Sequence, residues 1–162
     1  MNLITDRTLL DVERWKELRN KGWNGMTEQE RQEWMGEITS TPSAVKGMYT
    51  HNDFNRVESA VKALSERLTE LGYKHSPLVV KTDWSYDDEV WKQDMERYLS
   101  NIATIRKTIH VFPNTPTTPT VNNNLDYMSA NDIEKILIDV DTIATNIVKT
   151  QKYVGEIISG EV

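Results

Sequence analysis

The 162-residue sequence predicts an all-α protein, in which an N-terminal two-helix unit precedes three long heptad-patterned helices in a bundle. Apolar residues recur at alternating steps of three and four in three separate stretches, which is the spacing of helices packed against other helices. Helix-capping residues precede these stretches. The only strand-like run, Leu78 to Val80, is short and isolated, so we expect an extended linker there and no sheet.

The pattern divides the chain into three parts. We predict an N-terminal helical hairpin unit at residues 1–38, a linker at 39–49, and a helical bundle at 50–162 with a proline-rich crossing at 111–128. The prolines exclude a regular helix in this crossing. It is long enough to run back along a helix, so the helices on either side of it need not be antiparallel.

The first helix of the N-terminal unit is expected at residues 3–21. Thr5 or Asp6 can cap its start through a side-chain oxygen, and Gly22 can end it because glycine tolerates the left-handed conformation. One face of this helix carries an apolar stripe that would turn toward its neighbour. The stripe consists of Leu9, Val12, Trp15 and Leu18.

The second helix of this unit is short. Thr27 and Glu30 form a capping-box pattern, in which each side chain accepts a hydrogen bond from the backbone N–H of the other residue. The helix is expected to stop near Gly36, with Trp34 as its single large apolar anchor. Prolines, serines and threonines in the following residues predict the connector at 39–49.

A helix from Thr50 to Gly72 is the element on which the predicted bundle depends. Thr50 or Asn52 can cap its start, and Gly72 can end it in the left-handed conformation. Each long apolar side chain that it buries would contribute about 1.5–3 kcal/mol. Its packing seam consists of Phe54, Val57, Val61, Leu64, Leu68 and Leu71.

Two later helices repeat this seam. The first is expected to begin near Ser85 and Asp88, where acidic residues suit the helix dipole, and the second near Tyr127. Their seams consist of Trp91, Met95, Tyr98, Ile102, Ile105 and Ile109, and of Ile133, Ile136, Val140, Ile143 and Ile147. The last seam continues, weakened by Thr150, to Val154 and Ile157.

The starts of the central and last helices match at an offset of 79 residues, with Asn52-Asp53 corresponding to Asn131-Asp132. A duplicated helix-loop unit would explain the match. So would helix capping, which permits few residue types at a helix start. In either case we predict that both Asn-Asp pairs lie in equivalent first turns.

Composition excludes several classes of function. The formal net charge of −6 and the absence of a Lys/Arg-rich run argue against a nucleic-acid binder, which needs a basic face. No cysteine is present, so disulfides, thiolate metal sites and cysteine catalysis are excluded. Neither a signal peptide nor a stretch of transmembrane length is recognisable, and we expect no membrane partner.

No catalytic, metal or cofactor site is predicted, and we expect no enzyme. His51, His75 and His110 lack helical ligand spacing, and the acidic run 87–89 lacks the spaced oxygen ligands of a calcium loop. Serine-nucleophile and phosphate-binding glycine motifs do not occur. Arg97 and its neighbour Glu96 are expected on a solvated face with intrahelical ion pairs.

Five tryptophans are unusual in a chain of this size. Trp15, Trp34 and Trp91 fall on apolar faces and are expected to fill gaps between helices. Trp23 and Trp84 lie at predicted turns. These two are the candidates for partner contact, because exposed tryptophans stack on sugars or anchor protein interfaces.

Six short motifs occur in order along most of the chain and together resemble small structural proteins encoded among the tail genes of phages and prophages of Gram-positive bacteria. They are W-N-G-M-T-x-x-E-x-x-x-W at 23–34, K-G-M-Y-T-H-N-D-F-N-R-V-E at 46–58, T-D-W at 82–84, D-M-E-R-Y-L-x-N-I at 94–102, T-P-x-x-P at 115–119 and A-N-D-I-E-K-I-L at 130–137. The resemblance implies a virion structural protein and carries no activity or cofactor with it.

The resemblance and the seams together lead to one expected function. We expect a tail- or baseplate-associated connector that acts through helix packing, with other virion proteins and further copies of itself as partners. It would be found in the virion after assembly in the cytoplasm of the bacterial host. The alternative is a binding module for a cell-wall glycan or a host protein, which would use the tryptophans at the predicted turns.

Overall fold

The computed structural model describes residues 2–120 and 125–159 of the chain, with side-chain surroundings up to Val154. Over these residues the protein is helical and contains no strand, so the all-α prediction is confirmed. The run Leu78 to Val80 is extended chain, as expected for a linker. The helices are α1 (Leu9–Gly25), α2 (Glu28–Met35), α3 (Ala44–Gly47), α4 (His51–Glu70), α5 (Lys92–Thr108) and α6 (Tyr127–Ser159).

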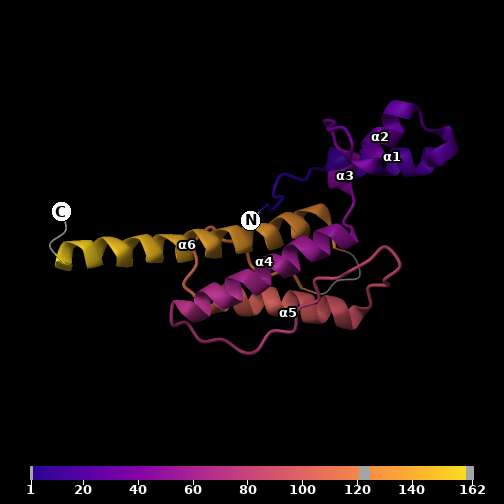
Figure 1. Ribbon diagram of the computed structural model, residues 1–162. Coiled ribbons are helices and arrows are strands. Elements are labelled where there is room, and N and C mark those ends of the chain that lie inside the picture. The colour runs from indigo at the N-terminus through magenta and orange to yellow at the C-terminus, as the bar shows by residue number, and fades with distance from the viewer. Residues whose placement is uncertain (1, 121–124, 160–162) are drawn as a thin grey trace.

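The helices form two lobes (Figure 1). We call α1–α3 the N-terminal lobe and α4–α6, with the segments between them, the main lobe. Each lobe has its own hydrophobic core: a small one around Leu18, Met26 and Ala44, and a larger one shared by the three long helices. None of the described helices has the length and apolar character needed to cross a lipid bilayer.

The three helices of the main lobe run in the same direction (Figure 1). Near their starts Arg56 of α4 pairs with Glu134 of α6, and further along Arg67 pairs with Asp141. Parallel helices need long connections. Segment 72–91 and the described part of the second connection, residues 109–120, run back along the helices mostly as extended chain, as the sequence allowed for the second crossing. Residues 121–124 of that crossing lie outside the described residues.

The central helix has the predicted caps. Thr50 and Asp53 form a capping box at its start. At its end Gly72 has a φ of +88°, in the left-handed region. The N–H of Tyr73 donates to the carbonyl of Leu68 at 2.9 Å, and that of Gly72 to Thr69 at 2.9 Å. This is the Schellman arrangement that satisfies the last carbonyls of a helix.

The residues of the predicted seams lie mostly in the main core. Leu71, Met95, Ile143 and Ile147 are partly buried against that core, whereas Trp91 and Val154 are exposed. The other seam residues whose surroundings are described are buried, and the side chain of Ile157 lies outside the described part. Trp91 is 65% exposed, so its assignment to the seam is wrong. The reason is that α5 begins at Lys92: Trp91 is its N-cap residue in an extended conformation and turns away from the core.

The predicted start of α5 near Ser85 is therefore also wrong. The carboxylate of Asp88 accepts a hydrogen bond from the Ser85 N–H at 2.8 Å, and the backbone N–H of Asp88 donates to the carbonyl of Ser85 at 3.2 Å. These bonds close an isolated turn. Capping chemistry of this kind stabilises turns as well as helix starts, which is why the sequence pattern was ambiguous.

The N-terminal lobe begins later than predicted. Its first helix starts at Leu9 and not at residue 3, because Thr8 and Asp11 form the capping box. Leu9 is 52% exposed and does not belong to the apolar stripe. Gly22 has a φ of +63° and interrupts the helix, which continues to Gly25. The second helix has the predicted Thr27–Glu30 capping box and ends at Gly36 in the left-handed conformation.

Residues 39–49 are more than a linker, because they contain α3, which packs on α1. A Cβ atom at Gly47 would lie 2.0 Å from the carbonyl oxygen of Asp11, so only glycine permits this approach. Ser43 donates its backbone N–H to the carboxylate of Asp11 at 2.6 Å. The sequence did not reveal this packing, since it depends on side chains from a distant helix.

The two Asn-Asp pairs do not lie in equivalent first turns. Asp53 is the third residue of α4, whereas α6 begins at Tyr127, so Asn131 and Asp132 fall in its second turn. The side chain of Asp126 caps α6 by accepting the N–H of Ser129 at 2.7 Å. The prediction of equivalent helix starts is therefore wrong.

Candidate functional site: a buried charge cluster between the lobes

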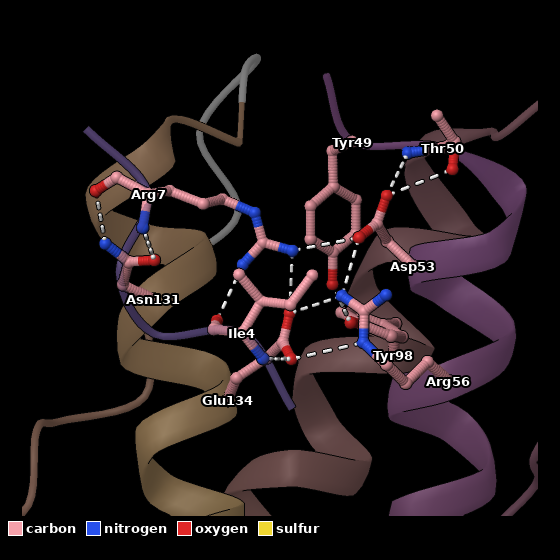
Figure 2. Close-up of polar contacts among 9 residues, drawn as sticks. All are labelled: Ile4, Arg7, Tyr49, Thr50, Asp53, Arg56, Tyr98, Asn131 and Glu134. Atoms are coloured by element: carbon pink, nitrogen blue, oxygen red, sulfur yellow. Dashed lines mark hydrogen bonds and ion pairs between the residues drawn. The ribbon is translucent and has the colours of Figure 1, made fainter. Parts of the chain in front are cut away.

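Two arginines and two carboxylates meet where the N-terminal segment reaches the main lobe (Figure 2). We call Arg7, Asp53, Arg56 and Glu134 the junction cluster. Arg7 lies just before α1 and is 4% exposed. Its Nη2 donates to Asp53 at 2.9 Å and to Glu134 at 2.8 Å, and its Nη1 donates to the carbonyl of Ile4 at 2.8 Å.

Arg56 completes the cluster from the opposite side (Figure 2). Its Nη2 donates to Asp53 at 2.6 Å and to Glu134 at 2.8 Å. Burial works against the charge of Arg56, but the hydrogen bonds to Glu134 and Asp53 outweigh it and raise the pKa of Arg56. The two positive and two negative charges balance, as buried ionic groups require.

All four carboxylate oxygens of the cluster accept two hydrogen bonds each. In Asp53, Oδ1 accepts from the two arginines and Oδ2 from the N–H and hydroxyl of Thr50. In Glu134, Oε1 accepts from both arginines, and Oε2 from Arg56 and the N–H of Ile4. Carboxylates saturated in this way hold other groups in place and have no free lone pair for proton transfer.

The side chain of Asn131 binds the backbone of the same N-terminal segment. Its Oδ1 accepts the N–H of Arg7 at 3.1 Å, and its Nδ2 donates to the carbonyl of Arg7 at 2.8 Å. The side-chain amide thus pairs with one residue of extended chain much as a neighbouring strand would. Ile4 and Arg7 therefore attach the N-terminal segment to α6, by backbone hydrogen bonds and by the ion pair of Arg7 with Glu134.

The chain also connects the two lobes between α3 and α4, and this second connection reaches the junction cluster at Tyr49. The hydroxyls of Tyr49 and Tyr98 lie 2.6 Å apart in a hydrogen bond, and burial raises the pKa of both. The Tyr49 ring packs edge-on against Phe54 at 5.1 Å, and the Arg7 guanidinium carbon lies 5.3 Å from its centroid. Both connections to the N-terminal lobe are thus fixed at one place.

A second buried carboxylate, Glu58, holds the first return segment. It is 1% exposed and accepts both Nη atoms of Arg97 at 2.7 Å each. It also accepts the indole N–H of Trp84 at 3.2 Å and the backbone N–H of Lys81 at 2.8 Å. The hydrogen bond to Glu58 raises the pKa of Arg97.

This arrangement corrects two predictions. Trp84 is 5% exposed and belongs to the main core, so it is not a partner-contact residue. Asn55 holds its backbone in the same manner as Asn131 holds Arg7, with hydrogen bonds of 2.7 and 2.8 Å. Arg97 does not form an intrahelical pair on a solvated face, because its partner is Glu58 on the neighbouring helix.

Trp23 is the predicted contact residue that remains accessible, at 51% exposure. The guanidinium carbon of Arg31 lies 5.4 Å from its ring centroid, so one face of the indole is covered by a cation. Trp15 and Trp34 are partly buried against the small core, as expected from their faces. Trp23 and Trp84 are therefore not brought together.

The histidines and acidic residues considered in the sequence do not converge. Over the described residues no group of three or more His, Asp or Glu side chains is placed to hold a metal ion. His75 lies 3.2 Å from the hydroxyl of Ser65, and Asp88 pairs with Lys81 at 3.0 Å. These side chains form contacts that hold separate segments of the chain together.

Sequence reasoning missed the buried charges. Glu58 and Glu134 each directly follow a seam residue, Val57 and Ile133, so they border the apolar face of their helices. That position is the one available signal, because long helices also carry exposed carboxylates beside their seams. Arg7 carries no signal, since its partners are 46 and 127 residues away.

No protein-family model matches the chain, and no curated protein or solved structure matches it.

Proposed function

We propose that the chain is a virion structural protein, a tail- or baseplate-associated connector of a phage or prophage of Gram-positive bacteria. The junction cluster is the observation that carries this proposal. Its charges are balanced, its carboxylate oxygens are saturated, and it ties two lobes together at one point. A part that transmits position within a particle needs such a rigid joint, and the motif resemblance supplies the setting.

In this proposal α4, α5 and α6 act as a three-helix bundle whose heptad-like seams close the core. Burial of Val57, Ile102 and Ile136 at 0% exposure supports that packing. The same seams would supply contacts to neighbours wherever one helix outlasts the others. Helix packing and oligomerisation, and no catalytic step or cofactor, then make up the activity. The partners are other virion proteins and further copies of this chain.

The alternative is a binding module that contacts a cell-wall glycan or a host protein through an exposed tryptophan. Trp23 is the residue that supports it, since its indole is half-exposed. The alternative is weaker for two reasons. Trp84, the other predicted contact residue, is buried in the main core, and Arg31 covers one face of the Trp23 indole.

Labelling of purified particles tests the proposal. Particles produced by a lysogen whose prophage encodes this chain are probed with gold-labelled antibody against it. Label at the tail or baseplate in intact particles is expected. Particles that contain no copy of the chain by mass spectrometry overturn the proposal. A glycan-binding screen of the protein and of Trp23→Ala distinguishes the alternative. A binding module is expected to bind glycan and to lose that binding in Trp23→Ala, whereas a connector is expected to bind no glycan in either form.

A further inference from the structure

The last helix is much longer than the helices it packs on. α6 has 33 residues, against 20 in α4 and 17 in α5. All three start at the same end of the main lobe, so a rise of 1.5 Å per residue carries α6 about 20 Å beyond its neighbours. Figure 1 shows its C-terminal half projecting alone. Ala144 is its last fully buried residue among those described, and every side chain from Val148 to Val154 is exposed.

The projecting half continues the face that packs inside the main lobe. At 100° per residue, Ile147, Thr150, Gln151 and Val154 lie on one side, in line with Ile143 and Ala144. This face carries no charge from Ile143 to Val154. Lys149 and Lys152 lie on the opposite side of the helix. Beside its base Phe112, Ile143 and Ile147 line a mostly apolar groove.

A helix half of this kind needs a partner. About 15 residues of isolated helix are marginal in water, and most helical stability in proteins comes from packing an apolar face. Val154, on this uncharged face, is 46% exposed in the single chain. Covering it removes apolar surface from water, which favours association.

We propose that the projecting half of α6, residues 145–159, pairs with the same segment of a second copy of this chain. Two identical helices can pair closely when their facing sides carry no like charges, and the uncharged face with its lysines turned outward meets that condition. The pairing is antiparallel. In a parallel pair the two helices would run side by side into the main lobes, where α4 and α5 already cover the same face of α6 before residue 145.

The antiparallel pair also defines a register. Each tip can advance only until it reaches the ends of α4 and α5 of the other copy, beside Phe112. The overlap then spans the whole projecting segment, with its midpoint at Lys152 in sequence. Thr150 of one copy therefore lies opposite Val154 of the second copy, and the contact is a two-fold, isologous one.

This inference deepens the proposed function, since it names the surface through which two connectors join. Its first test is the solution mass of the protein by light scattering after gel filtration. The expected mass is twice the 18.7 kDa of the chain. Val154→Lys places a charge in the pair, and its dissociation constant is expected to rise about tenfold or more.

Val148→Lys is the matched control. Val148 is 42% exposed, close to the 46% of Val154, but it lies about 120° away around the helix. This variant is expected to remain a dimer. A monomeric wild-type protein, or equal weakening by both variants, overturns the inference. Helix content from circular dichroism confirms that both variants fold.

Disulfide trapping tests the direction of the pair. The chain has no cysteine, so an introduced one can react only with another introduced one. Thr150→Cys and Val154→Cys chains, mixed and oxidised, are expected to form mostly the mixed disulfide. Preferential 150–150 and 154–154 products would reveal a parallel pair and overturn the proposed contact. Neither result affects the particle-labelling experiment, so failure of the pair and failure of the connector role remain distinguishable.

Discussion

Arg7 and Glu134 are 127 residues apart in sequence and form a fully buried ion pair at 2.8 Å. The contact joins the segment that leads into the N-terminal lobe to the longest helix of the main lobe. Its partners Asp53 and Arg56 make it part of a closed, neutral set (Figure 2). Breaking such a set by removing one member leaves a buried charge without compensation, which costs more than the intact set contributes.

Glu134→Gln is therefore expected to lower the free energy of unfolding by roughly 3–5 kcal/mol. The amide keeps the shape of the side chain but leaves Arg7 and Arg56 with one carboxylate between them. Urea denaturation followed by circular dichroism measures the loss. Glu66→Gln, on the exposed side of α4, is the control and is expected to change stability by less than about 0.5 kcal/mol. Similar effects of both variants would contradict the role given to the cluster.

Gly47→Ala is expected to separate α3 from α1. The added methyl would lie 2.0 Å from the carbonyl oxygen of Asp11, a backbone atom that cannot move aside alone. We expect a loss of about 1–3 kcal/mol, confined to the N-terminal lobe. Hydrogen exchange should show lower protection in residues 9–47 and unchanged protection in α4 to α6.

Gly25→Ala is the control for that experiment. Its added methyl would meet the side chain of Lys21 at 3.6 Å, an ordinary contact. Alanine also has a higher helix propensity than glycine, so stability should stay the same or rise by up to about 1 kcal/mol. If Gly47→Ala behaves like this control, α3 does not pack on α1 as described.

Trp84→Ala is expected to destabilise the main lobe by about 3–5 kcal/mol, because it empties a core site and removes a hydrogen-bond donor from buried Glu58. Trp23→Ala, at a half-exposed site, should cost less than about 1 kcal/mol. Thermal and urea denaturation of the two variants provide the comparison. Equal costs would argue against the burial of Trp84.

The N-terminal lobe is expected to lose stability in acid. The hydrogen bond from Lys21 lowers the pKa of Glu30 from an ordinary 4.5 to about 2, and the hydrogen bonds from Arg14 lower the pKa of Glu33. A carboxyl with a lowered native pKa binds its proton more readily in the unfolded chain. Its stabilisation is present above pH 4.5 and is lost as the pH falls toward 2.

Urea titrations at several pH values between 6 and 2, followed by NMR signals of the N-terminal lobe, measure this effect. Glu33→Gln removes one of the titrating groups, so its stability should depend less steeply on pH. The pKa of Asp132 in α6 is shifted in the opposite direction, because burial and then the charge of Asp126 raise it. Asp132→Asn should leave the acid response of the N-terminal lobe unchanged. Stability that rises on acidification would contradict the assignment.

Local sequence patterns predicted much of the fold. The capping box at Thr27, a capping residue at the start of α4 and the glycine at its end act over a few residues, so the sequence indicates them directly. The apolar spacing identified most of the core for the same reason. The prediction was wrong at Trp91, because the regular apolar spacing extends to this residue although α5 begins only after it, at Lys92.

By itself, the sequence determined that the chain is helical, which faces of its long helices are apolar, and where α2 and α4 end, because these depend on neighbouring residues. Tertiary structure alone decided that the three long helices run parallel, that Trp84 enters the core, and that Arg7, Asp53, Arg56 and Glu134 meet. A charged side chain has the same local pattern whether it faces water or a distant partner. Only the folded chain brings the partner within hydrogen-bond distance, and burial then makes that contact strong.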